Sequence, residues 1–132
     1  MKLFGPINSG STTGGAGVST ANASSTVILS GRVQGIYVKH NGSPPAGTTD
    51  VTVKTVGTSP YPPTYNLLAI VNAATDGWFY PRVQVHDTAG SAIAAEYTPL
   101  VIHDFVNVLI AQANDADSID VWLLLDDFST EQ

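Results

Sequence analysis

Closely spaced carboxylates form the sharpest metal-binding candidate in this sequence. Three aspartates lie within 115–120, and clustered carboxylate oxygens are the ligands that calcium prefers. The usual calcium-loop pattern is not met, because Ile119 stands where an oxygen ligand is needed, Asp120 replaces the glycine of the turn, and Asp126 replaces the bidentate glutamate. We interpret this segment, Asp115 to Asp120, as a solvated hairpin loop and predict no cofactor, with calcium in this loop as the alternative.

The histidines are the next candidates for chemistry. His40, His86 and His103 lie at or near the ends of expected strands, and Asp87 and Asp104 each follow a histidine. Adjacent residues of a strand point to opposite faces, so neither His-Asp pair forms a dyad by spacing alone. No Gly-x-Ser-x-Gly elbow is present, and the chain has only two glutamates to offer a carboxylate pair. We predict that the protein is not an enzyme.

Aromatic residues gather near loops in the middle of the chain. Aromatic rings there can stack on sugars or anchor a protein interface. The alternative is that they close one end of the core, which is the commoner fate of such side chains. The candidate partner-binding residues in this group are Tyr61, Tyr65, Trp78 and Tyr80.

The N-terminal segment differs in composition from the rest. Residues 1–7 are largely apolar, and 8–25 consist almost entirely of Ser, Thr, Gly, Ala and Asn. We predict a flexible or extended arm over 1–25, in which the polar residues 8–25 could span about 60 Å at about 3.3 Å per residue. It would carry Leu3, Phe4 and Ile7 onto a neighbouring subunit, and deleting it would leave the domain folded but abolish assembly. The alternative is a frayed terminus.

Composition excludes several functional classes. The chain has no cysteine, only 12% charged residues and a formal net charge of −6. Five scattered Lys and Arg residues cannot neutralise a run of phosphates, so nucleic acid and anionic membranes are poor partners. No apolar run is long enough for a membrane span or a signal peptide. We expect the protein to stay in the cytosol or to leave it inside an assembly.

Strand signals dominate from residue 26 onward. Val, Thr, Tyr and Ile are frequent, helix formers with charged side chains are scarce, and Gly and Pro separate the runs. We predict one all-β domain over 26–132, an antiparallel β-sandwich of the jelly-roll or immunoglobulin-like kind with about seven or eight strands. The expected strands are 26–30 and 32–40 (or one strand kinked at Gly31), 51–56, 66–71, 78–86, 100–103, 105–112 and 119–125.

Three details of this pattern are specific enough to test. Asp76-Gly77 predicts a hairpin turn between the strands on either side of it. Residues 92–97 fit either a short helix or an edge strand. In the last strand, apolar residues on both faces predict burial on both sides.

Three segments carry a resemblance to a known class. They read Thr-Val-Gly-Thr-Ser-Pro-Tyr-Pro-Pro, Ala-Ala-Thr-Asp-Gly-Trp-Phe-Tyr-Pro-Arg and Asp-Ser-Ile-Asp-Val-Trp-Leu-Leu-Leu. With them, the stretch from Val51 to Asp126 resembles small structural proteins of tailed bacteriophages. The resemblance implies a β-sandwich decoration or minor capsid protein and assigns no role to an individual residue.

We therefore expect a virion structural protein, a capsid decoration or cement protein assembled in the host cytoplasm. Its expected partners are further copies of itself, in a homo-oligomer, and a major capsid or other virion protein. A carbohydrate-binding module that uses the rings of Tyr61, Tyr65, Trp78 and Tyr80 is the alternative. A hydrolase would need polar groups converging on His86 or His103, which the sequence does not indicate.

Overall fold

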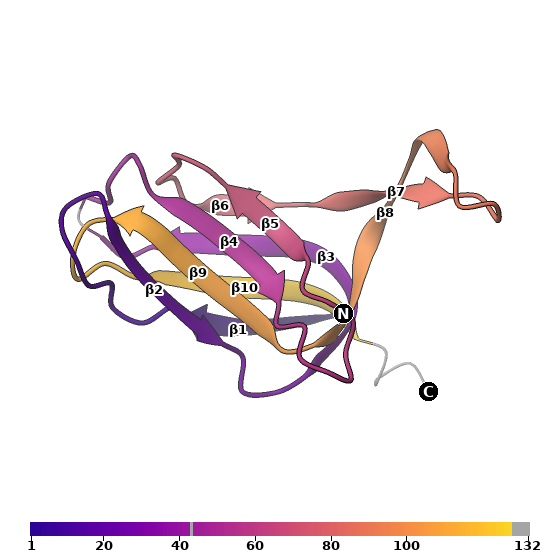
Figure 1. Ribbon diagram of the computed structural model, residues 1–132, viewed down its shortest axis with the longest axis horizontal. Coiled ribbons are helices and arrows are strands. Elements are labelled where there is room, and N and C mark those ends of the chain that lie inside the picture. The colour runs from indigo at the N-terminus through magenta and orange to yellow at the C-terminus, as the bar shows by residue number, and fades with distance from the viewer. Residues whose placement is uncertain (43, 128–132) are drawn as a thin grey trace.

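The computed structural model describes residues 1–42 and 44–127, and all regular structure within them is β-strand. The strands form two antiparallel sheets that pack face to face, which confirms the predicted β-sandwich (Figure 1). In this part of the chain, no helix has the length and apolar character needed to cross a membrane.

The two sheets differ in size. The larger has the order β1 (Lys2–Asn8), β10 (Ile119–Asp127), β3 (Leu29–His40), β8 (Ala92–Asp104) and β7 (Arg82–His86), and β6 (Gly77–Phe79) also pairs with β3. The smaller has the order β2 (Ser19–Ser24), β9 (Val106–Ala113), β4 (Asp50–Thr55) and β5 (Asn66–Ile70). Strands close in sequence often lie in different sheets, so the chain crosses between the layers repeatedly.

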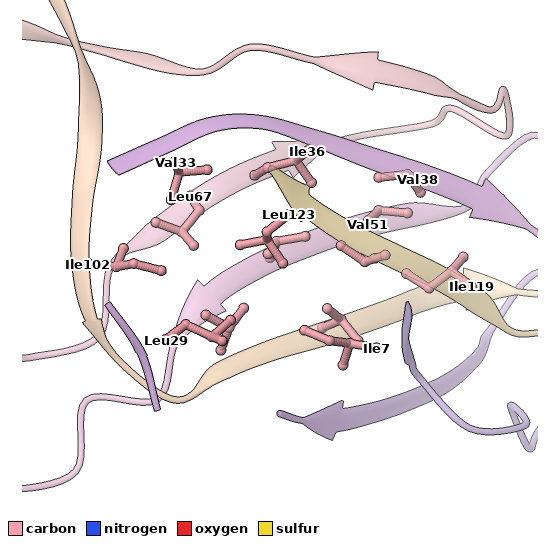
Figure 2. Close-up of a cluster of buried hydrophobic side chains, with 14 of the residues drawn as sticks. Ile7, Leu29, Val33, Ile36, Val38, Val51, Leu67, Ile102, Ile119 and Leu123 are labelled. Carbon is pink, nitrogen blue, oxygen red and sulfur yellow. The ribbon is translucent and has the colours of Figure 1, made fainter. Parts of the chain in front are cut away.

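The core lies between the sheets and follows the alternation of the strands. Every second residue of β4, β9 and β10 points inward, as the sequence predicts. The facing side chains are mostly β-branched, which suits a pleated surface buried on one face. Among the residues with no exposed surface are Val33, Ile36, Val38, Val51, Val53, Val106, Val108, Ile110, Ile119, Val121 and Leu123 (Figure 2).

The predicted arm over 1–25 is wrong, because this segment supplies an edge strand to each sheet of its own subunit. β1 pairs with β10, and β2 pairs with β9. Ile7 is only 6% exposed and belongs to the core. Between the two strands, Thr12 receives a backbone hydrogen bond from Ala116 and donates one to Asp117. A polar segment can form edge strands because its backbone bonds, rather than large side chains, attach it.

The predicted hairpin at Asp76-Gly77 is also wrong. β5 lies in the smaller sheet and β6 in the larger one, so residues 71–76 cross from one layer to the other. The Asp76 carboxylate anchors this crossing by accepting a hydrogen bond from the His40 backbone N–H at 2.7 Å. Elsewhere, β3 runs through Gly31 as one strand, and 92–97 are strand rather than helix.

Two separate segments of the chain pair with one edge of β3. β6 pairs with Ile36–Val38, and the end of β8 pairs with Leu29–Val33. Between these pieces the chain leaves the sheet, forms β7 and the first half of β8, and returns. We call residues 81–99 the projecting hairpin, because they extend away from the two layers (Figure 1). None of these residues is buried.

Candidate functional site

Three aromatic side chains form a row across the outer face of the larger sheet. Trp122 of β10 and Trp78 of β6 are each paired directly with Tyr37 of β3. The Tyr37 ring centroid lies 5.7 Å from that of Trp122 and 5.3 Å from that of Trp78. Cross-strand aromatic pairs of this kind stabilise a sheet by about 0.5–1.5 kcal/mol each beyond area burial. The strand register therefore holds the row in place.

Tyr80 extends the row, and glycines lie beneath its ends. The Tyr80 and Trp78 centroids are 6.2 Å apart with nearly parallel planes. Both rings lie over Gly35, where an added Cβ would come within 3.2 Å of Tyr80 and 3.3 Å of Trp78. At the other end, a Cβ on Gly5 would come within 2.9 Å of the Trp122 ring. The missing side chains let the rings lie against the backbone.

Leu3 completes this surface at the edge strand β1. Together, Leu3, Tyr37, Trp78 and Trp122 line an open, apolar hollow of about 240 Å³. We call these four residues and Tyr80 the aromatic belt. Exposure is 57% for Leu3, 42% for Trp78 and 60% for Tyr80. The belt is an apolar surface outside the core, and in the described part of the chain its Leu3, Trp78 and Tyr80 side chains remain exposed.

A second cleft lies where the loop before β5 meets the outer face of β8. Its volume is about 490 Å³, and its lining includes Tyr61, Tyr65, Val101 and His103. The Tyr65 hydroxyl donates a hydrogen bond to the Val101 carbonyl at 2.7 Å, and burial raises the pKa of this phenol. The Tyr61 and His103 rings meet edge to face, with their centroids 5.7 Å apart. The cleft is mainly apolar, with a few polar groups at its margin.

The structure separates the partner-binding residues predicted from the aromatic group. Trp78 and Tyr80 lie in the aromatic belt, whereas Tyr61 and Tyr65 lie in the second cleft. Of the three residues predicted at the tip of an arm, Leu3 lies in the belt, whereas Ile7 is in the core and Phe4 packs against it. These seven residues therefore do not form one surface.

Sequence reasoning missed Tyr37 and Trp122 as site residues. The alternation of β10 does place Trp122 on the outer face, opposite the buried Val121 and Leu123. No sequence signal pairs it with Tyr37, because the register between β10 and β3 brings together residues far apart in the chain. The aromatic belt therefore results from the order and register of the strands in the larger sheet.

The histidines and carboxylates do not assemble a catalytic group in the described part of the chain. The Asp104 carboxylate is buried and accepts hydrogen bonds from the backbone N–H groups of Gly57 and Phe105. Asp87 accepts from two N–H groups of its own turn. His40 Nδ1 lies 3.2 Å from Asp76 Oδ1, and its buried Nε2 has no hydrogen-bond partner among residues 1–42 and 44–127.

The acidic loop does not bring its aspartates together. Asp117 is buried and accepts a hydrogen bond from the Ser118 backbone N–H at 2.7 Å. Asp120 lies on the outer face, where its carboxylate accepts hydrogen bonds from Asn8 and Asn41. Over residues 1–42 and 44–127, no three His, Asp or Glu side chains are grouped as metal ligands.

No protein-family model, curated protein or solved structure matches this chain. Its function has to be inferred from its own surfaces. Two of these, the aromatic belt and the projecting hairpin, expose apolar side chains outside the core.

Proposed function

We propose that this protein is a non-enzymatic structural subunit of a virus particle. It would act as a capsid decoration or cement protein that stabilises the shell through contacts with other copies of itself and with a major capsid protein. The observation that carries the proposal is the uncovered apolar surface of the aromatic belt and the projecting hairpin. Soluble monomers scatter exposed apolar residues singly, whereas contiguous patches mark interaction sites.

The charge of the protein supports a position on the outside of a shell. The formal net charge is −6, with five Lys and Arg residues. Of these, Arg32 is paired with Asp126 at 2.8 Å. Such a surface repels packaged nucleic acid and anionic membranes. An acidic subunit is better suited to face solvent than the genome.

If a virus encodes this chain, as proposed, purified particles of that virus test the proposal. Mass spectrometry should find the protein in the particles in many copies. Particles made without it should lose their contents at a lower temperature than complete particles, because subunit contacts that bind only the intact shell stabilise it. Absence of the chain from purified particles would contradict the proposal.

Carbohydrate binding is the second candidate function, and the ring geometry of Trp78 and Tyr80 favours it. Their planes differ by 13°, and their side chains are exposed on a sheet face. Aromatic faces presented in this way can stack on the apolar faces of sugar rings. A sugar-binding protein should show a saturable change in tryptophan fluorescence with oligosaccharides. The change should be lost in Trp78→Ala and retained in Tyr97→Ala, a change of an exposed ring on the hairpin.

A further inference from the structure

The projecting hairpin has one apolar face. Ala92 pairs with His86, so their neighbours Ile93 and Val85 both point to the opposite face, which Val83 shares. The register shifts between the paired residues, and Ala95 takes a left-handed φ of 62° in this stretch. From Gln84 to His86, β7 advances two residues while β8 runs from Tyr97 to Ala92, so the pairing is irregular here.

Within the described part of the chain, this apolar face is only partly covered. Val83 is 42% exposed and Ile93 is 38% exposed. At the base of the hairpin, the Arg82 guanidinium donates a hydrogen bond to the Gln34 carbonyl at 3.3 Å. An isolated two-stranded hairpin is marginally stable in water and needs packing against another surface. A partner that covers the apolar face would supply that packing.

The aromatic belt is an apolar surface complementary to this face of the hairpin. The hairpin leaves the sheet after Tyr80 and extends past the sandwich (Figure 1), whereas the belt runs from Tyr80 across β3 and β10. β-branched side chains pack well on aromatic rings. The hairpin carries few charged side chains (Arg82, Asp87 and Glu96). Local electrostatic repulsion between the hairpin and a second acidic subunit is therefore small.

We propose that the projecting hairpin of one copy lies across the aromatic belt of a second copy, and that the exchange is reciprocal. This inference rests on the self-association included in the proposed function. The five residues of β7, at about 3.3 Å each, give a ribbon face of about 17 by 10 Å. One such contact buries about 340 Å² over both surfaces, and a reciprocal pair buries about 700 Å², the size of a weak or transient interface. The area therefore favours a two-fold dimer over a one-way contact.

Cysteine cross-linking tests the contact directly, because the chain has no cysteine of its own. Copies carrying Ile93→Cys are mixed with differently tagged copies carrying Leu3→Cys and oxidised mildly. We expect the mixed disulfide dimer to form in preference to one made with a Val71→Cys control, which places the cysteine at another exposed site. Equal yields from Leu3→Cys and Val71→Cys would overturn the proposal.

Sedimentation equilibrium measures the strength of the contact. Val83→Glu with Ile93→Glu should raise the dimer dissociation constant at least about 100-fold, because two charges would be buried against aromatic rings. Thr88→Glu with Ala89→Glu adds the same charge in the exposed turn of the hairpin and should change the constant less than about 3-fold. Circular dichroism and urea unfolding check that both variants remain folded. Equal effects of the two pairs would contradict the proposal.

The oligomeric state separates this inference from the proposed function. A wild-type monomer would overturn the exchange, and a trimer or larger ring would overturn its reciprocity, while the protein could still be found in particles. A dimer that cross-links as expected, from a chain that is absent from particles, would overturn the virion function and retain the exchange.

Discussion

Leu123 and Leu124 are adjacent in β10 but lie in different environments. Leu123 has no exposed surface and lies between the sheets, whereas Leu124 is half-buried on the outer face. Leu123→Ala should lower the free energy of unfolding by about 2–5 kcal/mol, because it leaves a cavity in the core. Leu124→Ala should cost less than about 1.5 kcal/mol. Urea unfolding of both variants measures the difference, and equal losses would contradict the assigned faces.

Ionisation of Tyr65 should lower the free energy of unfolding at alkaline pH. Burial raises its pKa above the ordinary value of 10.0, so the folded protein holds the phenolic proton more tightly than the unfolded chain. The resulting stability is complete below pH 10.0 and is lost as the pH rises through the folded pKa. Tyr65→Phe should remove this part of the alkaline decline in unfolding free energy. An unchanged pH profile in the variant would show that another group causes the decline.

Residues alone predict the inward face of a strand better than they predict the site. Val51 and Val53 alternate with polar residues, and both are fully buried in β4, because one face of a half-buried strand must be apolar. The belt escaped prediction because Tyr37, Trp78 and Trp122 become neighbours only through pairing of three distant segments. Side-chain type indicated a use for Trp78, but not which rings lie beside it.

At the scale of elements, the strong alternation of apolar and polar residues in β4, β9 and β10 was enough to predict these strands. The edge strands alternate weakly, and the sequence did not predict them. β1 contains Gly5 and Pro6, and β2 reads Ser-Thr-Ala-Asn-Ala-Ser. Neither looks like a strand by propensity. Each is a strand because a central strand of the sandwich offers it backbone hydrogen bonds. Edge strands are therefore the part of this fold that depends on its context.

Deletion of residues 1–25 should unfold the protein, in contrast to the expectation from sequence alone. The deletion removes β1 and β2 and takes Ile7 out of the core. The loss of two edge strands should exceed about 5 kcal/mol, which is much of the total stability of a small domain. Circular dichroism and urea unfolding measure the outcome. A truncated chain with a cooperative transition near that of the full chain would contradict the prediction.

Deletion of 81–99, with Tyr80 joined to Leu100, should leave the sandwich intact. On the other side of β3, the consecutive residues Leu123, Leu124 and Leu125 pair with Ile36, Gly35 and Val33. The joined strand would place Phe79, Tyr80 and Leu100 opposite the same three residues of β3. We expect a change of less than about 2 kcal/mol in unfolding free energy, because no residue of the hairpin is buried. Loss of cooperative unfolding in this variant would show that the hairpin supports the fold.

At the scale of the whole molecule, net charge acts against self-association. Each copy carries a formal charge of −6, so two copies repel each other at low ionic strength. Salt screens this repulsion over about 10 Å at 0.1 M, and it leaves apolar contacts intact. The dimer dissociation constant should therefore fall as sodium chloride is raised, as measured by sedimentation equilibrium. A constant that rises with salt would indicate an interface held by ion pairs.

The junction between β6 and β8 also has a consequence for how such a protein can evolve. The edge of β3 is completed by two short pieces of chain, and the segment between them leaves the sheet and returns to it. A gene can lengthen, shorten or replace that segment without changing any core position. Selection on what the protein contacts can then proceed separately from selection on folding, and foreign peptides can be displayed at the same place.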